Sequence, residues 1–172
     1  MHRRTIMFNI FRRKQERTND MLTVLGVDDR VRGTAGEEYV HHEQQITELI
    51  KPITEVEAKT TIDGLPNNIY WMVGHVIVEN EYRLIPNAAN TEIAGLAKYF
   101  KSGTSPDDFD EDIPSFETLK LLLPLQTKRL LGGICDRDEL YIKNDDIEFA
   151  ANHMTLHLGQ LKTMHQLIMN KD

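Results

Sequence analysis

Residues 151–164 read ANHMTLHLGQLKTM, and they lie in the segment that decides the fold. From about residue 145 to residue 170 there is no proline, and apolar residues recur at helical spacing at Ile147, Ala150, Met154, Leu158, Leu161 and Ile168. A second apolar row consists of Phe149, Leu156, Met164 and Leu167. We therefore expect one long, largely buried helix. His153 and His157 lie four residues apart, on one face of that helix. Such a pair either binds a metal ion or forms hydrogen bonds with neighbouring helices.

The composition is that of a globular protein with a single core. The chain has 172 residues, of which 40% are hydrophobic and 27% charged. A formal net charge of -7 argues against nucleic acid as the main partner, because phosphate binding favours a basic surface. Cys135 is the only cysteine, so an internal disulfide is excluded and a cytoplasmic location is expected. No apolar run approaches the roughly 20 residues that span a bilayer, so no membrane association is expected.

The first twenty residues differ from the rest of the chain. They are basic and mildly amphipathic, and their short apolar run is interrupted by Asn9. We expect residues 1–20 to be a loosely ordered leader and residues 21–172 to form one helical domain. A segment that binds a membrane surface or a partner is the alternative for the leader.

Four further segments have the pattern of helices. Long helices are expected in EEYVHHEQQITELIKPI (37–53), NNIYWMVGHVIVENEYRLI (67–85) and FETLKLLLPLQTKRLLGGI (116–134), and a short one in TEIAGLAKYF (91–100). Asn67 or Asn68, Thr91 and Ser115 are the expected N-caps. ELYIK (139–143) could form a strand, but a single strand has no partner. The pattern predicts an all-α four-helix bundle with longer connections and a short extra helix.

A third histidine lies in the second long helix. His75 is surrounded by apolar residues, with Val73 and Val76 beside it, and alone it is well explained as a hydrogen-bonded core residue. Together with His153 and His157 it supplies three neutral nitrogen ligands from facing helices, and bundle cores often hold such sites.

These segments resemble a known family. NNIYWMVGHV (67–76) and NHMTLHLGQL (152–161) are similar to the two signature segments of the DinB-like (DinB/YfiT) superfamily of metal-binding four-helix bundles. KYFKSGTSPDDFDEDIPSFETL (98–119) resembles the family's segment before the third helix. The resemblance extends over about residues 37–168. It implies that His75, His153 and His157 bind a divalent metal such as zinc, nickel or iron, and that the protein is a homodimer.

The ligand set has clear chemical consequences. Three protein ligands leave a coordination position for water or substrate, as in catalytic zinc sites. Neutral imidazoles also leave the ion its full charge, which favours a deprotonated nucleophile. Glu79 is a candidate fourth ligand or general base, with a solvated carboxylate as the alternative. Gln160 is a candidate for orienting a ligand or bound water, with helix packing as the alternative. Gly159 is expected to permit close approach of another helix.

Two other metal-site patterns do not fit. A His-Glu-x-x-His metalloprotease needs glutamate where Met154 lies. A di-iron bundle needs two Glu-x-x-His motifs, and only Glu38 to His41 provides one. His41 and His42 are therefore expected to be exposed polar residues. Tyr39, Tyr82 and Tyr141 either line a pocket or pack against the core or surface.

The sequence favours a metal-dependent enzyme that activates a low-molecular-weight thiol or water, a transferase or hydrolase acting on a small molecule. The alternatives are a non-catalytic metal-binding stress or interaction protein, and a bundle without metal. Cys135, expected in the loop beyond the third long helix near Asp136 and Asp138, is not expected to supply a reacting sulfur. The two apolar rows of the last helix also favour a homodimer.

Overall fold

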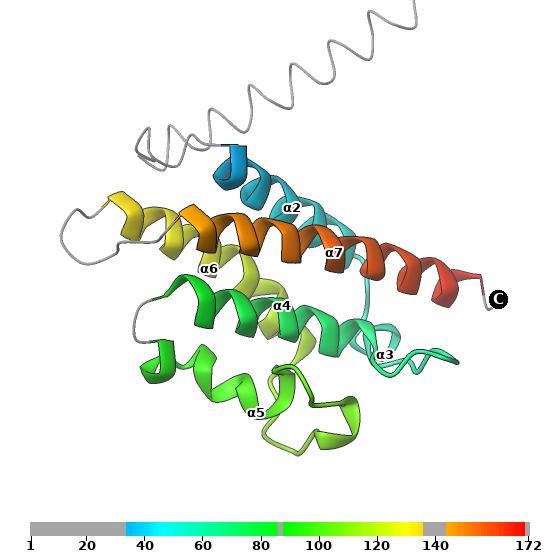
Figure 1. The fold of residues 1–172 in the computed structure, drawn as a ribbon. Coiled ribbons are helices and arrows are strands. Elements are labelled where there is room, and N and C mark those ends of the chain that lie inside the picture. Colours follow the sequence, from blue (N-terminus) through cyan, green and yellow to red (C-terminus); the bar gives the residue numbers. More distant parts are fainter. Residues whose placement is uncertain (1–33, 86–87, 136–143, 171–172) are drawn as a thin grey trace, which may run out of the picture.

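A computed structural model describes residues 34–85, 88–135 and 144–170, and within these ranges it contains helices and no strand (Figure 1). The long helices are α2 (Thr34–Ile50), α4 (Ile69–Leu84), α6 (Phe116–Cys135) and α7 (Asn144–Met169). The prediction of an all-α protein is therefore confirmed. The leader, Tyr141 and ELYIK lie outside the described residues, so the division at residues 20 and 21 stays a prediction.

Local signals explain where these helices begin and end. The side chain of Asn68 accepts a hydrogen bond from the Trp71 backbone N–H at 2.9 Å, so Asn68 is the N-cap of α4. Ser115 Oγ accepts one from the Thr118 N–H at 3.2 Å in the same way at the start of α6. The helix α2 ends at Ile50, just before Pro52.

Two boundaries differ from the sequence prediction. The helix α6 continues through Gly132 and Gly133 to Cys135, so Cys135 ends the helix and does not lie in a loop. A short helix, α3 (Glu55–Ala58), was not predicted. Its signal was present in the sequence, because Thr54 and Glu57 form a capping box at the spacing that such boxes require.

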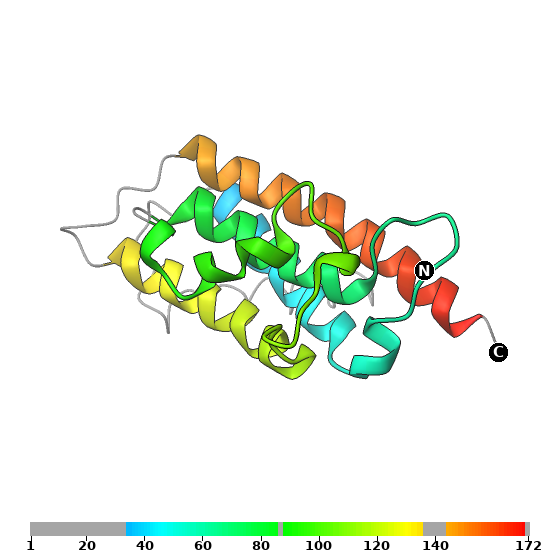
Figure 2. The ribbon, with the colours of Figure 1, turned by 90° about the horizontal axis from the view of Figure 1, so that it is seen from below.

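The long connection between α4 and α6 covers one side of α4, as seen from below in Figure 2. It contains η1 (Ala88–Asn90), η2 (Ile93–Leu96), α5 (Ala97–Phe100) and η3 (Pro106–Asp108). The expected helix over residues 91–100 is therefore divided into η2 and α5. The Thr91 hydroxyl does accept a hydrogen bond from the Ala94 N–H, at 3.2 Å.

The four long helices pack in a ring: α7 lies against α2 and α4, and α6 lies against the same two helices. Their shared core includes large, fully buried side chains from every one of them and from α5. These include Tyr70, Phe100, Phe116, Ile46, Ile50, Ile77, Leu119, Leu123 and Met154. Among the described residues, no helix is both long and apolar enough to cross a membrane.

The two apolar rows of α7 have different surroundings. In the first row, Ala150, Met154, Leu158 and Leu161 are buried as predicted, and Ile147 and Ile168 pack partly against the core. In the second row only Met164 is buried. Phe149, Leu156 and Leu167 are 48%, 59% and 43% exposed, so the expectation that most of this helix is buried was wrong for them.

A buried polar cluster joins α4 to α6. Glu81 is fully buried on α4, and its Oε2 accepts a hydrogen bond from Gln126 Nε2 at 2.8 Å. The Arg129 guanidinium forms an ion pair with the same oxygen. Gln126 Nε2 also donates to the Ile77 carbonyl oxygen at 2.9 Å. The carboxylate of Glu81 is thus buried only because α6 supplies its donors.

Candidate metal centre

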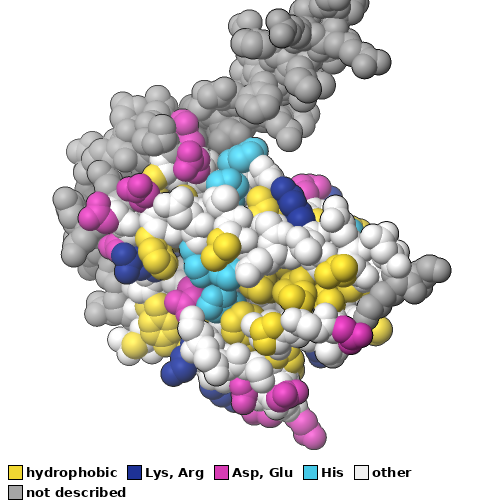
Figure 3. Space-filling view, turned by 45° about the vertical axis from the view of Figure 1, so that its right-hand side comes forward, with side chains coloured by type: hydrophobic (Ala, Val, Ile, Leu, Met, Phe, Trp, Pro, Cys, Tyr) yellow, Lys and Arg dark blue, Asp and Glu magenta, His cyan; other side chains and the backbone are white. Residues whose placement is uncertain are grey.

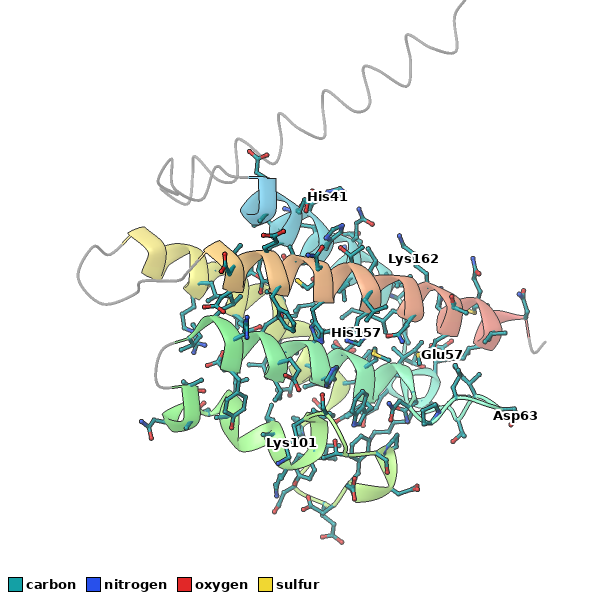
Figure 4. The ribbon with its side chains drawn as sticks, in the orientation of Figure 1. His41, Glu57, Asp63, Lys101, His157 and Lys162 are labelled. Atoms are coloured by element: carbon teal, nitrogen blue, oxygen red, sulfur yellow. The ribbon has the colours of Figure 1, made fainter. Side chains whose placement is uncertain are left out.

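The three histidines singled out from the sequence come together between α4 and α7. His75 projects from α4, and His153 and His157 project from α7, and one potential ligand atom from each lies within 4.8 Å of the others. Their ring centroids are 5.2 Å apart for His75–His153, 5.0 Å for His75–His157 and 4.3 Å for His153–His157. Figure 4 shows the labelled His157 directed from α7 toward α4.

The orientation of His75 is fixed by its neighbours. Its Nδ1 lies 2.8 Å from the backbone oxygen of Phe100. Because a carbonyl oxygen only accepts, Nδ1 carries the proton and Nε2 keeps its lone pair for a ligand. The Trp71 ring stacks on the imidazole at a centroid distance of 4.6 Å. Trp71 Nε1 in turn donates to Thr104 Oγ1 at 3.0 Å, which holds the stack in place.

Gly74 makes the contact between His75 and Phe100 feasible. A Cβ built on Gly74 would lie 2.4 Å from Cδ1 of the Phe100 ring, which is far inside van der Waals contact. Phe100 is completely buried, so its ring has little room to move away. The glycine before His75 thus lets α5 pack close enough for its last carbonyl to bind the imidazole.

The two histidines of α7 face each other. His157 Nδ1 lies 2.6 Å from Gln160 Oε1, so this nitrogen carries the proton and Nε2 has the lone pair. That Nε2 lies 2.9 Å from His153 Nε2. His153 Nδ1 is buried and has no hydrogen-bond partner among the described residues. Among the described residues, the neighbouring imidazole is thus the only hydrogen-bond partner of the His153 ring, which suits a side chain that can bind a cation.

The protonation of this pair also favours a cation. Burial, together with the neighbouring His157 and His75, lowers the pKa of His153 from 6.5 to about 4, although Glu79 opposes this shift. Burial also lowers the pKa of His157, although the hydrogen bond that His157 donates to Gln160 opposes this shift. Both imidazoles are thus neutral near pH 7, which is the form that binds metals.

The dimensions fit a divalent metal. Zinc binds imidazole nitrogen at about 2.0–2.1 Å, so two nitrogens in a tetrahedral site lie roughly 3.4 Å apart. The three ligand atoms lie within 4.8 Å of one another, so small side-chain adjustments bring them to that separation. Histidine also suits nickel and iron, so the donor set does not choose among these metals.

The structure distinguishes between the alternative roles predicted for Glu79, Gln160 and Gly159. Glu79 Oε1 accepts hydrogen bonds from the Ser102 N–H and hydroxyl at 3.2 and 3.1 Å, and lies 3.9 Å from His75 Nδ1. Glu79 is therefore beside the site but outside the cluster of ligand atoms. Gln160 orients His157, which is the first of the two roles predicted for it. Gly159 makes no close contact with another helix among the described residues, because a Cβ there would meet nothing within 4 Å.

Four other candidates lie elsewhere. Tyr39 is buried and its hydroxyl accepts a hydrogen bond from Asn80 at 3.4 Å, so it packs in the core, whereas Tyr82 is 48% exposed. His41 and His42 are half-buried rather than exposed. His42 lies 3.0 Å from the Thr155 hydroxyl of α7, which accounts for its partial burial.

Sequence reasoning missed a group at the edge of the site. Phe149 stacks on His153 at a centroid distance of 5.9 Å, and the Arg83 guanidinium lies 4.5 Å above the Phe149 ring. Asp146 forms an ion pair with Arg83 at 2.8 Å. In Figure 3 the histidines reach the surface beside an acidic side chain and several apolar ones. From the sequence, Phe149 was expected to be buried in the core. Its position four residues before His153 was the only sign that the two rings lie on one face of the helix.

A separate pocket of about 510 Å³ lies between α6 and the segment around η2, and none of the three histidines lines it. It is lined by Thr91, Glu92, Ile93, Leu96, Pro114, Thr118, Leu122, Leu125, Gln126 and Arg129. We place the candidate site at the histidines, because their orientation and protonation have a specific chemical use.

No family model matches the chain, and no curated protein matches it either. We therefore infer function from the geometry above and from the two segments that resemble the DinB-like signatures.

Proposed function

We propose that this protein is a metal-dependent enzyme in which His75, His153 and His157 hold a divalent metal. The observation that carries the proposal is the convergence of three imidazoles from two helices, with Nδ1 of His75 and of His157 occupied by Phe100 and Gln160. Partners of this kind fix the tautomer of histidines that bind metals. A purely structural cluster has no need to direct lone pairs toward a common point.

The ring of α2, α4, α6 and α7 supports a four-helix bundle of the DinB-like type. Residues 67–76 and 152–161, which resemble the two signature segments, then lie next to each other in the fold, since both contribute histidines to the space between α4 and α7. Membership of that superfamily is part of the proposal.

The proposed reaction uses a small-molecule thiol or water as nucleophile, in a transferase or hydrolase. The metal, when bound, would supply a positive charge that favours the deprotonated nucleophile at neutral pH. Glu79 is the proposed general base, and its Oε1 lies at the edge of the site, 3.9 Å from His75 Nδ1. The cytoplasmic location expected from the single cysteine stays a prediction.

The second candidate is a metal-binding stress or interaction protein without catalysis. Half-exposed apolar residues at the edge of the site, Phe149 and Leu156, favour this alternative, because they also suit contact with another protein.

The deciding experiment is metal analysis of protein purified without a histidine tag. We expect close to one equivalent of divalent metal in the wild type. Alanine at His75, His153 or His157 should reduce bound metal at least tenfold while helical content, measured by circular dichroism, stays near wild type. Alanine at His41 is the matched control and should keep the metal. Stoichiometric metal in all three single variants would refute the site.

A panel of thiols with electrophiles, run beside a panel of hydrolase substrates, separates the enzyme from the non-catalytic alternative. Activity should disappear on chelation, return with a divalent ion and survive Cys135→Ser. Loss of a thiol-dependent reaction in Cys135→Ser, with metal content unchanged, would contradict the proposed source of the sulfur.

A further inference from the structure

Arg83 is held in a defined position at the edge of the histidine cluster. It projects from the last turn of α4, and its Nε lies 2.8 Å from Asp146 Oδ1 of α7. Its guanidinium lies over the Phe149 ring, with Cζ 4.5 Å from the ring centroid. An ion pair and a cation–π contact together restrict a side chain that would otherwise have many rotamers.

This arrangement connects Arg83 to the proposed metal ligands. The Phe149 ring is nearly parallel to the His153 imidazole, with an interplanar angle of 13° and a centroid distance of 5.9 Å. The Phe149 ring thus contacts both the Arg83 guanidinium and His153, a proposed metal ligand. In Figure 3 apolar side chains lie beside the histidines, and a basic side chain lies beyond them on the same face.

The guanidinium of Arg83 has N–H donors besides the Nε–H that faces Asp146, and these could bind a ligand. Only Nε is used by Asp146, and Arg83 has no other ion pair among the residues that the structure describes. The side chain is 44% exposed, so the Nη groups are accessible to solvent. Two N–H groups of a guanidinium form a fork that matches a carboxylate. Because the fork is already positioned, a ligand would lose less free energy in ordering it.

The charges around the site also favour an anion. A histidine that binds a metal does so as the neutral imidazole, so a divalent ion held by the three histidines would keep two positive charges, and Arg83 adds one. Asp146 and Glu79 offset two of these, and Glu79 is held away by Ser102. One positive charge remains at the surface of a protein whose formal net charge is -7.

We propose that Arg83 determines substrate specificity by binding a carboxylate on a molecule whose other end reaches the metal. This inference rests on the proposed function, since it needs the metal at the histidines. Phe149 then serves as a platform that positions Arg83, and its exposure reflects contact with the substrate.

The test uses tag-free protein loaded with cobalt(II), whose absorption changes when a thiolate binds. Two probes of equal chain length, 4-mercaptobutyrate and 4-mercapto-1-butanol, differ only in the carboxylate. We expect wild type to bind the carboxylate probe about tenfold more tightly, the range of one charge-assisted hydrogen bond. Arg83→Gln should lose this preference while keeping its affinity for the alcohol. Lys162→Gln removes a basic residue of α7 that contacts Gln45 instead, and should keep the preference.

A second variant separates recognition from a purely structural tie between α4 and α7. Asp146→Asn removes the competing negative charge but keeps a side-chain oxygen that can accept from Arg83 Nε, so Arg83 stays in position and the preference for 4-mercaptobutyrate should increase. A decrease in Asp146→Asn, or an unchanged preference in Arg83→Gln, would overturn the role of Arg83 and leave the metal site standing. Failure of the wild type to bind cobalt would overturn the proposed function and this inference with it.

Discussion

At Gly74 the absence of one methyl group determines how closely Phe100 approaches His75. We predict that Gly74→Ala weakens metal binding about tenfold, because Phe100 must move and its carbonyl then no longer fixes the imidazole. Overpacking of this kind also costs about 1–3 kcal/mol of stability. Competition with a chromophoric chelator measures the affinity, and thermal unfolding measures the stability.

Gly159→Ala is the matched control for that substitution. A Cβ at Gly159 meets nothing within 4 Å, so alanine should preserve metal affinity and stabilise the helix by up to about 1 kcal/mol. Equal metal affinity in the two variants would show that the contact between Gly74 and Phe100 does not position His75.

Glu43 offers a prediction about pH. It is 3% exposed, and burial raises its pKa above the ordinary value of 4.5, although a hydrogen bond from Thr47 opposes this shift. The folded state therefore binds its proton more tightly, and stability falls as pH rises from about 4.5 through the raised pKa. Because glutamine does not ionise, Glu43→Gln should not lose stability over this pH range. The melting temperature of the variant should exceed that of wild type at pH 7 and match it near pH 4; the same difference at both pH values would contradict the assignment.

At the level of residues, the sequence identified the three histidines and Gln160, because each lies in a short segment with fixed helical spacing. It did not identify Phe100 or Arg83 as their neighbours. Phe100 lies 25 residues after His75 and reaches it only because the connection folds back over α4. Such contacts depend on tertiary packing, and no local pattern encodes them.

Between elements, the Glu81–Arg129 pair makes the contact of α4 with α6 sensitive to charge. We predict that Arg129→Met destabilises the protein by about 1–3 kcal/mol, since it leaves the carboxylate of Glu81 buried with Gln126 as its remaining donor while Arg129 itself is half exposed. The double variant Glu81→Met, Arg129→Met should recover most of that loss. Denaturant unfolding checks both, and a single variant as stable as wild type would contradict the prediction.

Helix boundaries were predictable where a side chain caps them. Asn68 and Ser115 both begin a helix where the sequence expected it, because their side chains satisfy backbone N–H groups that the helix leaves free. The end of α6 was missed, since two consecutive glycines usually stop a helix and here the helix continues to Cys135. Glycine weakens a helix without forbidding it, so neighbouring contacts decide.

For the whole molecule, we expect a homodimer formed through the exposed row of α7. Leu156 and Leu167 are 59% and 43% exposed, and a second copy of the chain would cover them. Leu156→Glu should convert the dimer to a monomer, and light scattering at micromolar concentration measures the mass. A monomeric wild type under these conditions would count against the assembly.

The proposed metal ligands come from two helices that are distant in sequence, since His75 lies in α4 and His153 and His157 lie in α7. An ion bound to all three would join parts of the chain about eighty residues apart, and because the unfolded chain does not hold these residues together, the ion would bind the folded state alone. Free metal at one hundred times its dissociation constant would then add about 2.7 kcal/mol to the free energy of unfolding. Metal supply would in this way set how long the protein survives proteolysis, whether or not substrate is present.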